Sequence, residues 1–553
     1  MGALVATALA VVGCSPALGS PLSPRPTDST TSSTSTSTTT TSAVSVAATE
    51  VGPVCPTSFC LVYHLAPEAT WSDGAPVTAA DLKATANLHR FAGTGGESGY
   101  DLIESVEVVD ERTAMVVFSR PHGAWGSLFS RVFRSGHAAG DVTEIDTTGP
   151  FQLVEWARGE HVLLQRDPDW WAQTDPMSGS PVGQAQQIEF VFIDDPEELT
   201  DALEDGEVDV ISLRADTDTI EALSDIEGVR FATSPGSFWE HLDFNHADPL
   251  LSQRWIREVF AHAIDRQKLL DRTVRLIDPE ATALDNTVWM TGTKHYRQNF
   301  MDRHDPVRAG QMLADHGCGV GEDGIQVCDG QRLSFVWAST DDDPARREAF
   351  DSVREDLAAV GIEVIGDFRS PSSFVTRDFL FGDTWQLINF SWRARPEPMA
   401  ANPVYYCDDA EGLNVNRYCS AAVADLVRST DSIVDPGRRA EAYNRADSLY
   451  LEDLALIPLY QKLNLLAWTA ELSGPVPNNS LSTDLWNVAG WSGKDSIVVA
   501  LPAEPLEIDP LSTSDDNANM IMAPLMYGAF GMSPTQETIP VLVDTVDVLL
   551  RGN

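Results

Sequence analysis

The residues that enzymes commonly use for chemistry are present in this sequence, but they are not arranged in catalytic patterns. No G-x-S-x-G nucleophile motif, H-E-x-x-H zinc motif or Walker phosphate loop occurs. The 11 histidines are scattered without metal-ligand spacing, and 82 acidic residues make close carboxylate pairs unavoidable. The sequence therefore predicts a protein that is not an enzyme, with no cofactor and no metal site.

The seven cysteines, by contrast, are spaced in a way that carries information. Cys14 ends an apolar segment, residues 2–13, which is too short to span a bilayer and has the length of the apolar part of an export signal. Residues 11–14, VVGC, resemble a bacterial lipobox, in which the cysteine is lipidated and becomes the mature N-terminus. We therefore predict a lipid anchor at Cys14, the alternative being a stray cysteine in an apolar leader.

The other six cysteines predict three local disulfides, because close pairs in an exported protein are normally oxidised. Zinc is disfavoured, since the pairs lack the two-residue spacing and nearby histidines of structural zinc sites. The predicted pairs are Cys55 with Cys60, Cys318 with Cys328, and Cys407 with Cys419.

Composition separates a predicted tether from a predicted folded part. Residues 15–52 are rich in Ser, Thr and Pro and cannot bury enough apolar surface to fold, so they predict a disordered tether. The 553 residues carry 37 basic and 82 acidic side chains, a formal net charge of −45. This balance excludes nucleic acid as a partner, because phosphate binding needs clustered Lys and Arg.

Strand-like and helix-like segments alternate from about residue 60, which predicts an α/β architecture of two lobes. The clearest strands are residues 61–65, 114–118 and 188–193, which are rich in β-forming residues. The clearest helices are 196–203 with Asp194 or Asp195 as N-cap, 254–270, and 345–360 with its start capped within Asp341, Asp342 and Asp343.

Several motifs, read in order, resemble the extracytoplasmic solute-binding proteins of ABC importers, in the class that binds dipeptides, oligopeptides and nickel complexes. The motifs extend over about 400 residues and define a fold rather than a pocket. Within them, Thr78 and Asp81 predict a helix cap, and Asp265 with Arg266 predicts a structural ion pair. The motifs are 71–81 (WSDGAPVTAAD), 148–151 (TGPF) with 164–171 (LQRDPDWW), 244–245 (FN) with 256–257 (IR) and 261–266 (AHAIDR), 305–317 (DPVRAGQMLADHG), and 457–460 (IPLY).

The resemblance implies a two-lobed periplasmic-binding-protein fold of class II type, with an extra subdomain and a hinge between the lobes. Its function would be to capture peptides or a related small solute between the lobes and deliver it to a membrane permease. The protein would be a monomer at the extracytoplasmic face of the bacterial cell membrane, held there by its lipid. The alternative is a surface receptor for signalling or adhesion that uses the same fold without transport.

The order of the segments departs from the family pattern at both ends. The family's opening strand, L-D-P turn and helix have no room before residue 71. Segments that resemble them occur instead after residue 491, where a member of the family would normally end: 496–501 (SIVVAL), 506–510 (LEIDP), the helical 517–527, and 539–542. We favour circular permutation over a truncated second copy, because one set of elements is present without duplicates. The predicted divisions are 1–14 signal, 15–52 tether, 53–243 first lobe with the extra subdomain, 244–475 second lobe, and 476–553 return to the first lobe, with 494–553 supplying the missing beginning.

Candidate ligand-binding residues lie where this family's strands cross or line the gap between the lobes. Aromatic side chains there offer apolar contact, although each could equally pack in the core. The candidates are Phe238, Trp239, Asn245, Trp392, Arg393, Glu397 and Asp509.

The segment after Trp392 differs from that of the family's peptide binders. Those proteins carry an aspartate shortly after the tryptophan, which pairs with the peptide's amino group. Here Arg393 and Arg395 follow instead, and Glu397 occupies only the later, usually structural position. Because arginine suits carboxylate and phosphate, we expect weaker capture of a free peptide N-terminus and room for an anionic group.

Overall fold

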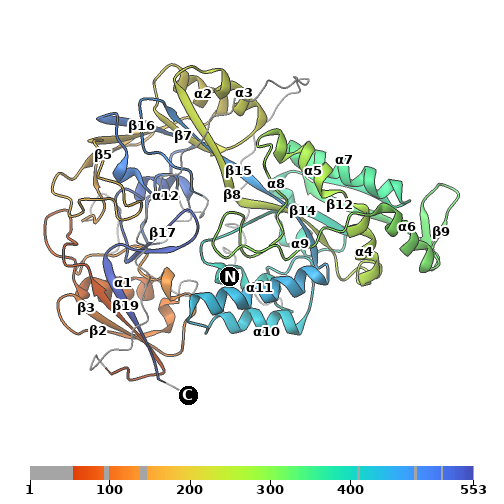
Figure 1. Ribbon diagram of the computed structural model, residues 1–553, viewed down its shortest axis with the longest axis horizontal. Helices are drawn as coiled ribbons and strands as arrows, with labels where there is room; N and C mark the ends of the chain where they lie inside the picture. Colours follow the sequence, from red (N-terminus) through yellow and green to blue (C-terminus); the bar gives the residue numbers. More distant parts are fainter. Residues whose placement is uncertain are drawn as a thin grey trace, which may run out of the picture.

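The computed structural model describes residues 54–92, 99–136, 146–407, 412–478, 483–511 and 515–551. Figure 1 shows two lobes side by side, joined by two long strands that run from one lobe into the other. These strands are β8 (Val229–Phe244) and β15 (Leu456–Thr469). The predicted two-lobed α/β fold is therefore confirmed.

A ten-stranded mixed sheet extends through both lobes, in the order β13-β12-β14-β8-β15-β7-β16-β6-β5-β4. On the first-lobe side the strands are β4 (Phe151–Ala157), β5 (His161–Arg166), β6 (Gln187–Phe192), β7 (Val210–Arg214) and β16 (Ser496–Leu501). On the second-lobe side they are β12 (Ser334–Thr340), β13 (Glu363–Arg369) and β14 (Leu387–Arg393).

A separate four-stranded sheet, in the order β19-β1-β3-β2, forms the lower part of the first lobe in Figure 1. Helix α1 (Ala79–Ala92) packs on it, and a small hairpin, β17 (Phe530–Met532) with β18 (Thr538–Pro540), lies beside it. The four strands are β1 (Phe59–Leu65), β2 (Ile103–Val108), β3 (Thr113–Phe118) and β19 (Val543–Leu550).

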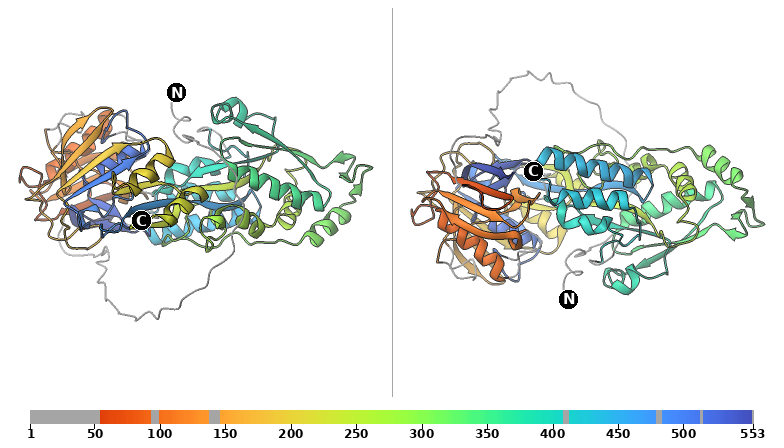
Figure 2. Two further views of the ribbon diagram at one scale, coloured as in Figure 1. Left: turned by 90° about the horizontal axis from the view of Figure 1, so that it is seen from above. Right: turned by 90° about the horizontal axis from the view of Figure 1, so that it is seen from below.

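The C-terminal segment takes part in both sheets of the first lobe. Strand β16 lies between β6 and β7 and is parallel to both, with Ser496 opposite Gln187. Strand β19 is antiparallel to β1 along the whole length of β1, with Leu550 opposite Phe59. The first lobe is thus built from two parts of the chain that are far apart in sequence, and Figure 2 shows them intermingled.

Helices cover the sheets, and most of them begin with a cap that the sequence makes recognisable. Asp195 caps α2 and Asp343 caps α7, each accepting a hydrogen bond from a backbone amide of the first turn. The helices of the first lobe, besides α1, are α2 (Pro196–Glu204), α3 (Thr217–Asp225) and α12 (Asp516–Met522). Those of the second lobe are α4 (Arg254–Ala263), α5 (Arg266–Arg272), α6 (Pro306–Asp315), α7 (Pro344–Ala359), α8 (Pro371–Phe374), α9 (Arg377–Leu380), α10 (Ala421–Thr430) and α11 (Pro436–Glu452).

Short elements complete the fold. A three-stranded ribbon projects from the second lobe and contains β9 (Gly319–Val320), β10 (Gln326–Cys328) and β11 (Gln331–Arg332). The 3-10 helices are η2 (Tyr100–Leu102), η3 (Trp125–Ser127), η5 (Val274–Leu276), η6 (Pro398–Tyr405) and η7 (Val488–Gly490).

Three sequence predictions need correction. The single helix at 254–270 is two helices, because Ile264 is extended and Asp265 caps a new helix by accepting hydrogen bonds from Gln267 and Lys268. Arg266 therefore pairs with Asp285, at 2.9 Å, and not with Asp265. The helix expected over 517–527 ends at Met522, just before Pro524, which cannot continue a helical hydrogen-bond ladder.

Other local predictions are confirmed. The strands expected at 61–65, 114–118 and 188–193 are β1, β3 and β6. Asp81 accepts hydrogen bonds from the backbone amide and the hydroxyl of Thr78, at 2.6 and 3.0 Å. Disulfides join Cys55 to Cys60, Cys318 to Cys328 and Cys407 to Cys419. Cys14 and the tether lie outside the described residues.

Candidate functional site

The two strands that join the lobes lose their regular pairing at one place. Their ladder passes from Gln461 opposite Trp239 to Leu463 opposite Pro235, so that Lys462 and residues 236–238 fall in the interruption. Gly236 is needed there because a Cβ atom on it would lie 2.8 Å from the carbonyl oxygen of Lys462. Among the described residues, β8 and β15 are the strands that link the two halves of this sheet, and a break in their pairing is suited to a hinge.

A small hollow that is open to solvent lies beside this interruption. Its apolar side chains include Phe238 of β8, Phe374 of α8 and Phe390 of β14. Its charged side chains are Arg214 at the end of β7, Arg346 on α7 and Lys462 on β15. The hollow therefore combines aromatic faces with cations drawn from both lobes, as small-molecule sites commonly combine apolar walls and few polar groups.

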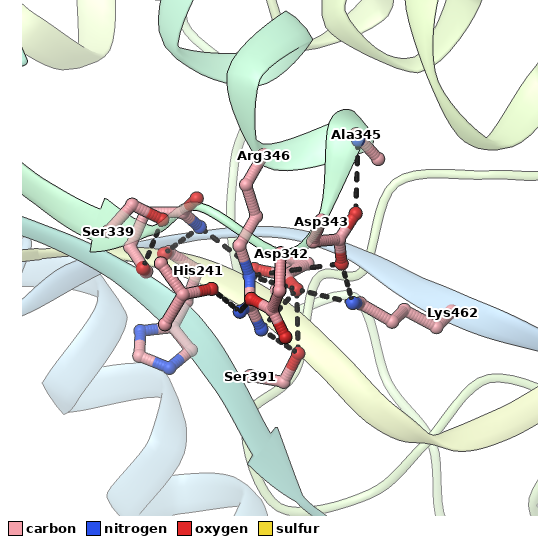
Figure 3. Close-up of polar contacts among 11 residues, drawn as sticks. His241, Ser339, Asp342, Asp343, Ala345, Arg346, Ser391 and Lys462 are labelled. Atoms are coloured by element: carbon pink, nitrogen blue, oxygen red, sulfur yellow. Dashed lines mark hydrogen bonds and ion pairs between the residues drawn. The ribbon is translucent and has the colours of Figure 1, made fainter. Parts of the chain in front are cut away.

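Two of the lining residues, Arg346 and Lys462, interact with three carboxylates that do not line the hollow. We refer to Glu240, Asp342, Asp343, Arg346 and Lys462 as the hinge cluster, and Figure 3 labels all of them except Glu240. Glu240 is 1% exposed and lies 3.1 Å from both the Arg346 guanidinium and the Lys462 ammonium. It also accepts hydrogen bonds from Ser391 at 2.6 Å and Asn389 at 2.9 Å. Asp343 pairs with Lys462 and caps α7.

The charges of the hinge cluster shift one another's protonation. Burial by itself would raise the pKa of Glu240, but Arg346 and Lys462 outweigh it and hold that pKa below its usual range. Burial would also raise the pKa of Asp343, but Lys462 and Arg346 together outweigh it and lower that pKa. Both carboxylates stay ionised, and the cluster ties α7 to the two strands that cross between the lobes.

The seven sequence candidates are only partly brought together. Phe238 lines the hollow. Arg393 lies over the ring of Phe238 at 5.6 Å and pairs with Asp516 of the first lobe. Trp392 is half-buried and contacts Phe390, with ring centres 5.1 Å apart. These three residues are therefore in or next to the hollow.

The other four candidates have structural contacts away from the hollow. Trp239 is 4% exposed and packs in the second-lobe core. The side chain of Asn245 donates to the Trp385 carbonyl and accepts from the Ala247 amide, both at 3.1 Å. Glu397 caps η6 and pairs with Arg439, and Asp509 accepts a hydrogen bond from Leu511 in the turn after β16.

Sequence reasoning missed Arg214, Glu240, Arg346 and Lys462. One signal was available, because Glu240 interrupts the apolar part of a strand and Lys462 is one of only five lysines in the chain. No local pattern joins them, since strand pairing and the packing of α7 bring them together. In the part of the chain that the structure describes, no group of three or more His, Cys, Asp or Glu could hold a metal ion.

The fold and the hollow at the lobe junction define a two-lobed binding protein, and comparison with known families gives the class. Residues 59–412 match the family described as bacterial extracellular solute-binding proteins, family 5 middle. The chain belongs to this family. The sequence-based recognition of a solute-binding protein in the peptide and nickel class of ABC importers is thereby confirmed. No helix within the described ranges is long and apolar enough to cross a membrane.

Individual proteins show the same likeness. The chain is 24% identical to the oligopeptide-binding protein OppA of Mycobacterium bovis, over 75% of this chain and 71% of that protein. Among solved structures, the periplasmic EDTA-binding protein EppA has a TM-score of 0.65 at 21% identity, covering 78% of this chain and 84% of its own. The oligopeptide-binding protein AppA of Bacillus subtilis, in complex with a nonapeptide, has a TM-score of 0.54 at 18% identity, covering 79% and 88%.

Proposed function

We propose that this protein captures a peptide or a related small solute between its lobes and delivers it to the permease of an ABC importer. The observation that carries the proposal is the hollow at the interruption of β8 and β15, where aromatic and cationic side chains from both lobes meet. The names of the related proteins support small solutes of this kind, since they include oligopeptide-binding proteins and an EDTA-binding protein. A solute held there would contact both lobes at once and so favour their closure.

Mass spectrometry of the natively purified full chain tests this proposal. We expect a retained small solute that dissociates on denaturation, together with a rise in melting temperature when it is added back. The variant Phe238→Ala should retain less solute because it removes an aromatic wall of the hollow. Phe91→Ala is the matched control, since Phe91 is 94% exposed on the first lobe. Equal retention by both variants would place the binding site elsewhere.

We further propose that a lipid on Cys14 anchors the protein at the extracytoplasmic face of the cell membrane and that the folded part acts as a monomer. The short apolar segment before Cys14 and the Ser/Thr/Pro-rich segment after it support the anchor. Replacing Cys14 with Ala should move the protein from the membrane fraction to the soluble fraction. Retention at the membrane in that variant would contradict the proposed anchor.

We also propose that the fold is a circular permutation of the family's usual order, with residues 494–553 supplying elements that the family places first. Three contacts support it: β16 inserts between β6 and β7, β19 pairs with β1, and the Arg551 amide donates to the Ser58 carbonyl at 3.2 Å. Neighbouring ends make such a rearrangement physically easy. A rearranged chain with residues 494–551 joined ahead of residue 54 should fold and bind as the natural chain does.

A further inference from the structure

Arg214 is the cation of the described lining with the fewest polar contacts. It ends β7, where its backbone pairs with Asn464 of β15, and its side chain is exposed. Its guanidinium carbon lies 5.1 Å from the ring centre of Phe238. Among the described residues, its guanidinium forms no hydrogen bond and no ion pair. An aromatic face thus holds the guanidinium in place while leaving its five N–H donors available.

The other cations near the hollow are already neutralised. Arg346 is 3% exposed and interacts with Glu240, Thr340 and Ser391. Arg393 pairs with Asp516, and Lys462 pairs with both Glu240 and Asp343. Arg214 is therefore the cation of the described lining that is free to meet a charged group on a solute.

No carboxylate lines the hollow within the described part of the chain, because Glu240 and Asp343 lie behind the cations that they neutralise. An ammonium group entering the hollow would meet the unpaired charge of Arg214 and would find no carboxylate on the described lining to pair with. A carboxylate would meet Arg214, whose planar fork can donate two parallel hydrogen bonds to it. The arrangement favours an anionic group over a cationic one.

The charge of Asp342 also affects how strongly the hollow would bind a charged group. Its carboxylate oxygens are buried and accept no hydrogen bond from any described residue, and the nearest cation, Arg346, is 3.9 Å away. The hinge cluster thus holds three carboxylates against two cations. Asp342 does not line the hollow, so its charge acts on a bound group through space: it weakens the binding of an anion and strengthens that of a cation.

We propose that the hollow binds a carboxylate or a similar planar oxyanion of the solute and that Arg214 is the residue that recognises it. This inference rests on the proposed binding function and narrows it to solutes that present an anionic group at the lobe junction. The free amino group of a peptide would have to lie outside the hollow.

Calorimetry of the full chain with three matched peptides tests the inference. The peptides are trialanine, its C-terminal amide, which lacks the carboxylate, and its N-acetyl form, which lacks the ammonium group. We expect acetylation to change the affinity little and amidation to weaken it by about tenfold or more. An amide that binds as well as the N-acetyl form would overturn the inference.

Absence of binding by all three peptides would also count against the inference, and native mass spectrometry separates the two proposals in that case. A retained solute that lacks an anionic group leaves the binding function standing while the inference fails. Without any retained solute, both proposals fail together.

Two substitutions should shift the affinity for N-acetyl-trialanine in opposite directions. Arg214→Gln should weaken binding about tenfold by removing the charged donors, whereas the amide should be nearly unaffected. Asp342→Asn should strengthen binding about threefold by removing a nearby negative charge. Arg230→Gln is the matched control, since Arg230 is exposed on the same strand as Phe238. The opposite signs would show that the hollow prefers a cation and would overturn the proposal.

Discussion

The four-stranded sheet of the first lobe and the hinge cluster are both buried, but they are held together by different forces. In β1, every residue except His64 is buried, and the sheet closes by pairing with β19 from the far end of the chain. The hinge cluster instead packs three carboxylates and two cations between β8, β15 and α7. The sheet is a permanent apolar junction, whereas the cluster places costly charges where the lobes meet and a solute is expected.

The largest effect should come from deleting residues 494–553, which removes β16 and β19 from the two sheets of the first lobe. The deletion leaves β1 with an open edge and separates β6 from β7. We expect the product to lose its cooperative unfolding transition and to aggregate. Calorimetry measures the first effect and light scattering the second. A soluble product that melts cooperatively would contradict the permutation. It would also show that the first lobe does not depend on the pairing of β1 with β19.

The next largest effect should come from Glu240→Gln in the hinge cluster. The substitution leaves Arg346 and Lys462 buried with one fewer partner, and breaking a buried charge pair in this way costs about 3–5 kcal/mol of unfolding free energy. Urea unfolding measures the loss, with Glu221→Gln on the exposed face of α3 as the control. A loss below about 1 kcal/mol would mean that the cluster resembles a solvated surface network.

A pH-dependent effect is expected from Asp447, a buried carboxylate of the second lobe that lies outside the hinge cluster. Burial raises its pKa to about 6, although Thr287 and Asn299 donate hydrogen bonds to it. The folded state therefore holds a proton that the unfolded state releases near pH 4, so the contribution of Asp447 to stability is largest below pH 4 and falls as the pH rises to 6.

The variant Asp447→Asn should lack this dependence. The difference in unfolding free energy between the natural protein and the variant should shrink by up to about 3 kcal/mol from pH 4 to pH 7. Urea unfolding at a series of pH values measures it, with the exposed Asp425→Asn as control. A constant difference across that range would show that burial does not raise the pKa of Asp447.

The smallest effect should come from Lys294→Met, which removes a contact between the lobes. Lys294 lies 2.7 Å from Glu537 of the first lobe, and the two side chains are 55% and 41% exposed. Such a pair contributes less than about 1 kcal/mol and weakens with salt. The backbone hydrogen bond from Lys294 to Thr535, at 2.9 Å, remains. A larger loss of unfolding free energy that persists in high salt would show that this contact contributes strongly to holding the two lobes together.

Much of the fold could be predicted from sequence because it depends on local patterns. Strands such as β1 and β3 follow from runs of β-forming residues, and Asp195 and Asp343 are recognisable as helix caps. The helix expected over 254–270 was wrong because its apolar periodicity continues across Ile264 and Asp265, where the backbone turns.

The hollow could not be predicted in the same way. Arg214 and Lys462 come close only because β7 and β15 pair in the sheet, and nothing near either residue in the sequence indicates it. Arg393 showed the opposite difficulty. It was expected near the gap between the lobes and lies over the ring of Phe238, but its partner Asp516 comes from the C-terminal segment, which no local pattern could link to it.

The Cys55–Cys60 disulfide has a mechanical consequence. It packs against Val62, Met115 and Val117 of the four-stranded sheet, at the place where the chain enters the fold. A pull on the chain ahead of Cys55 is transmitted through this covalent ring into β1 and its two neighbouring strands, which must shear together before they yield. The force does not pass through β8 or β15. Tension on a segment attached ahead of Cys55 would therefore not separate the two lobes.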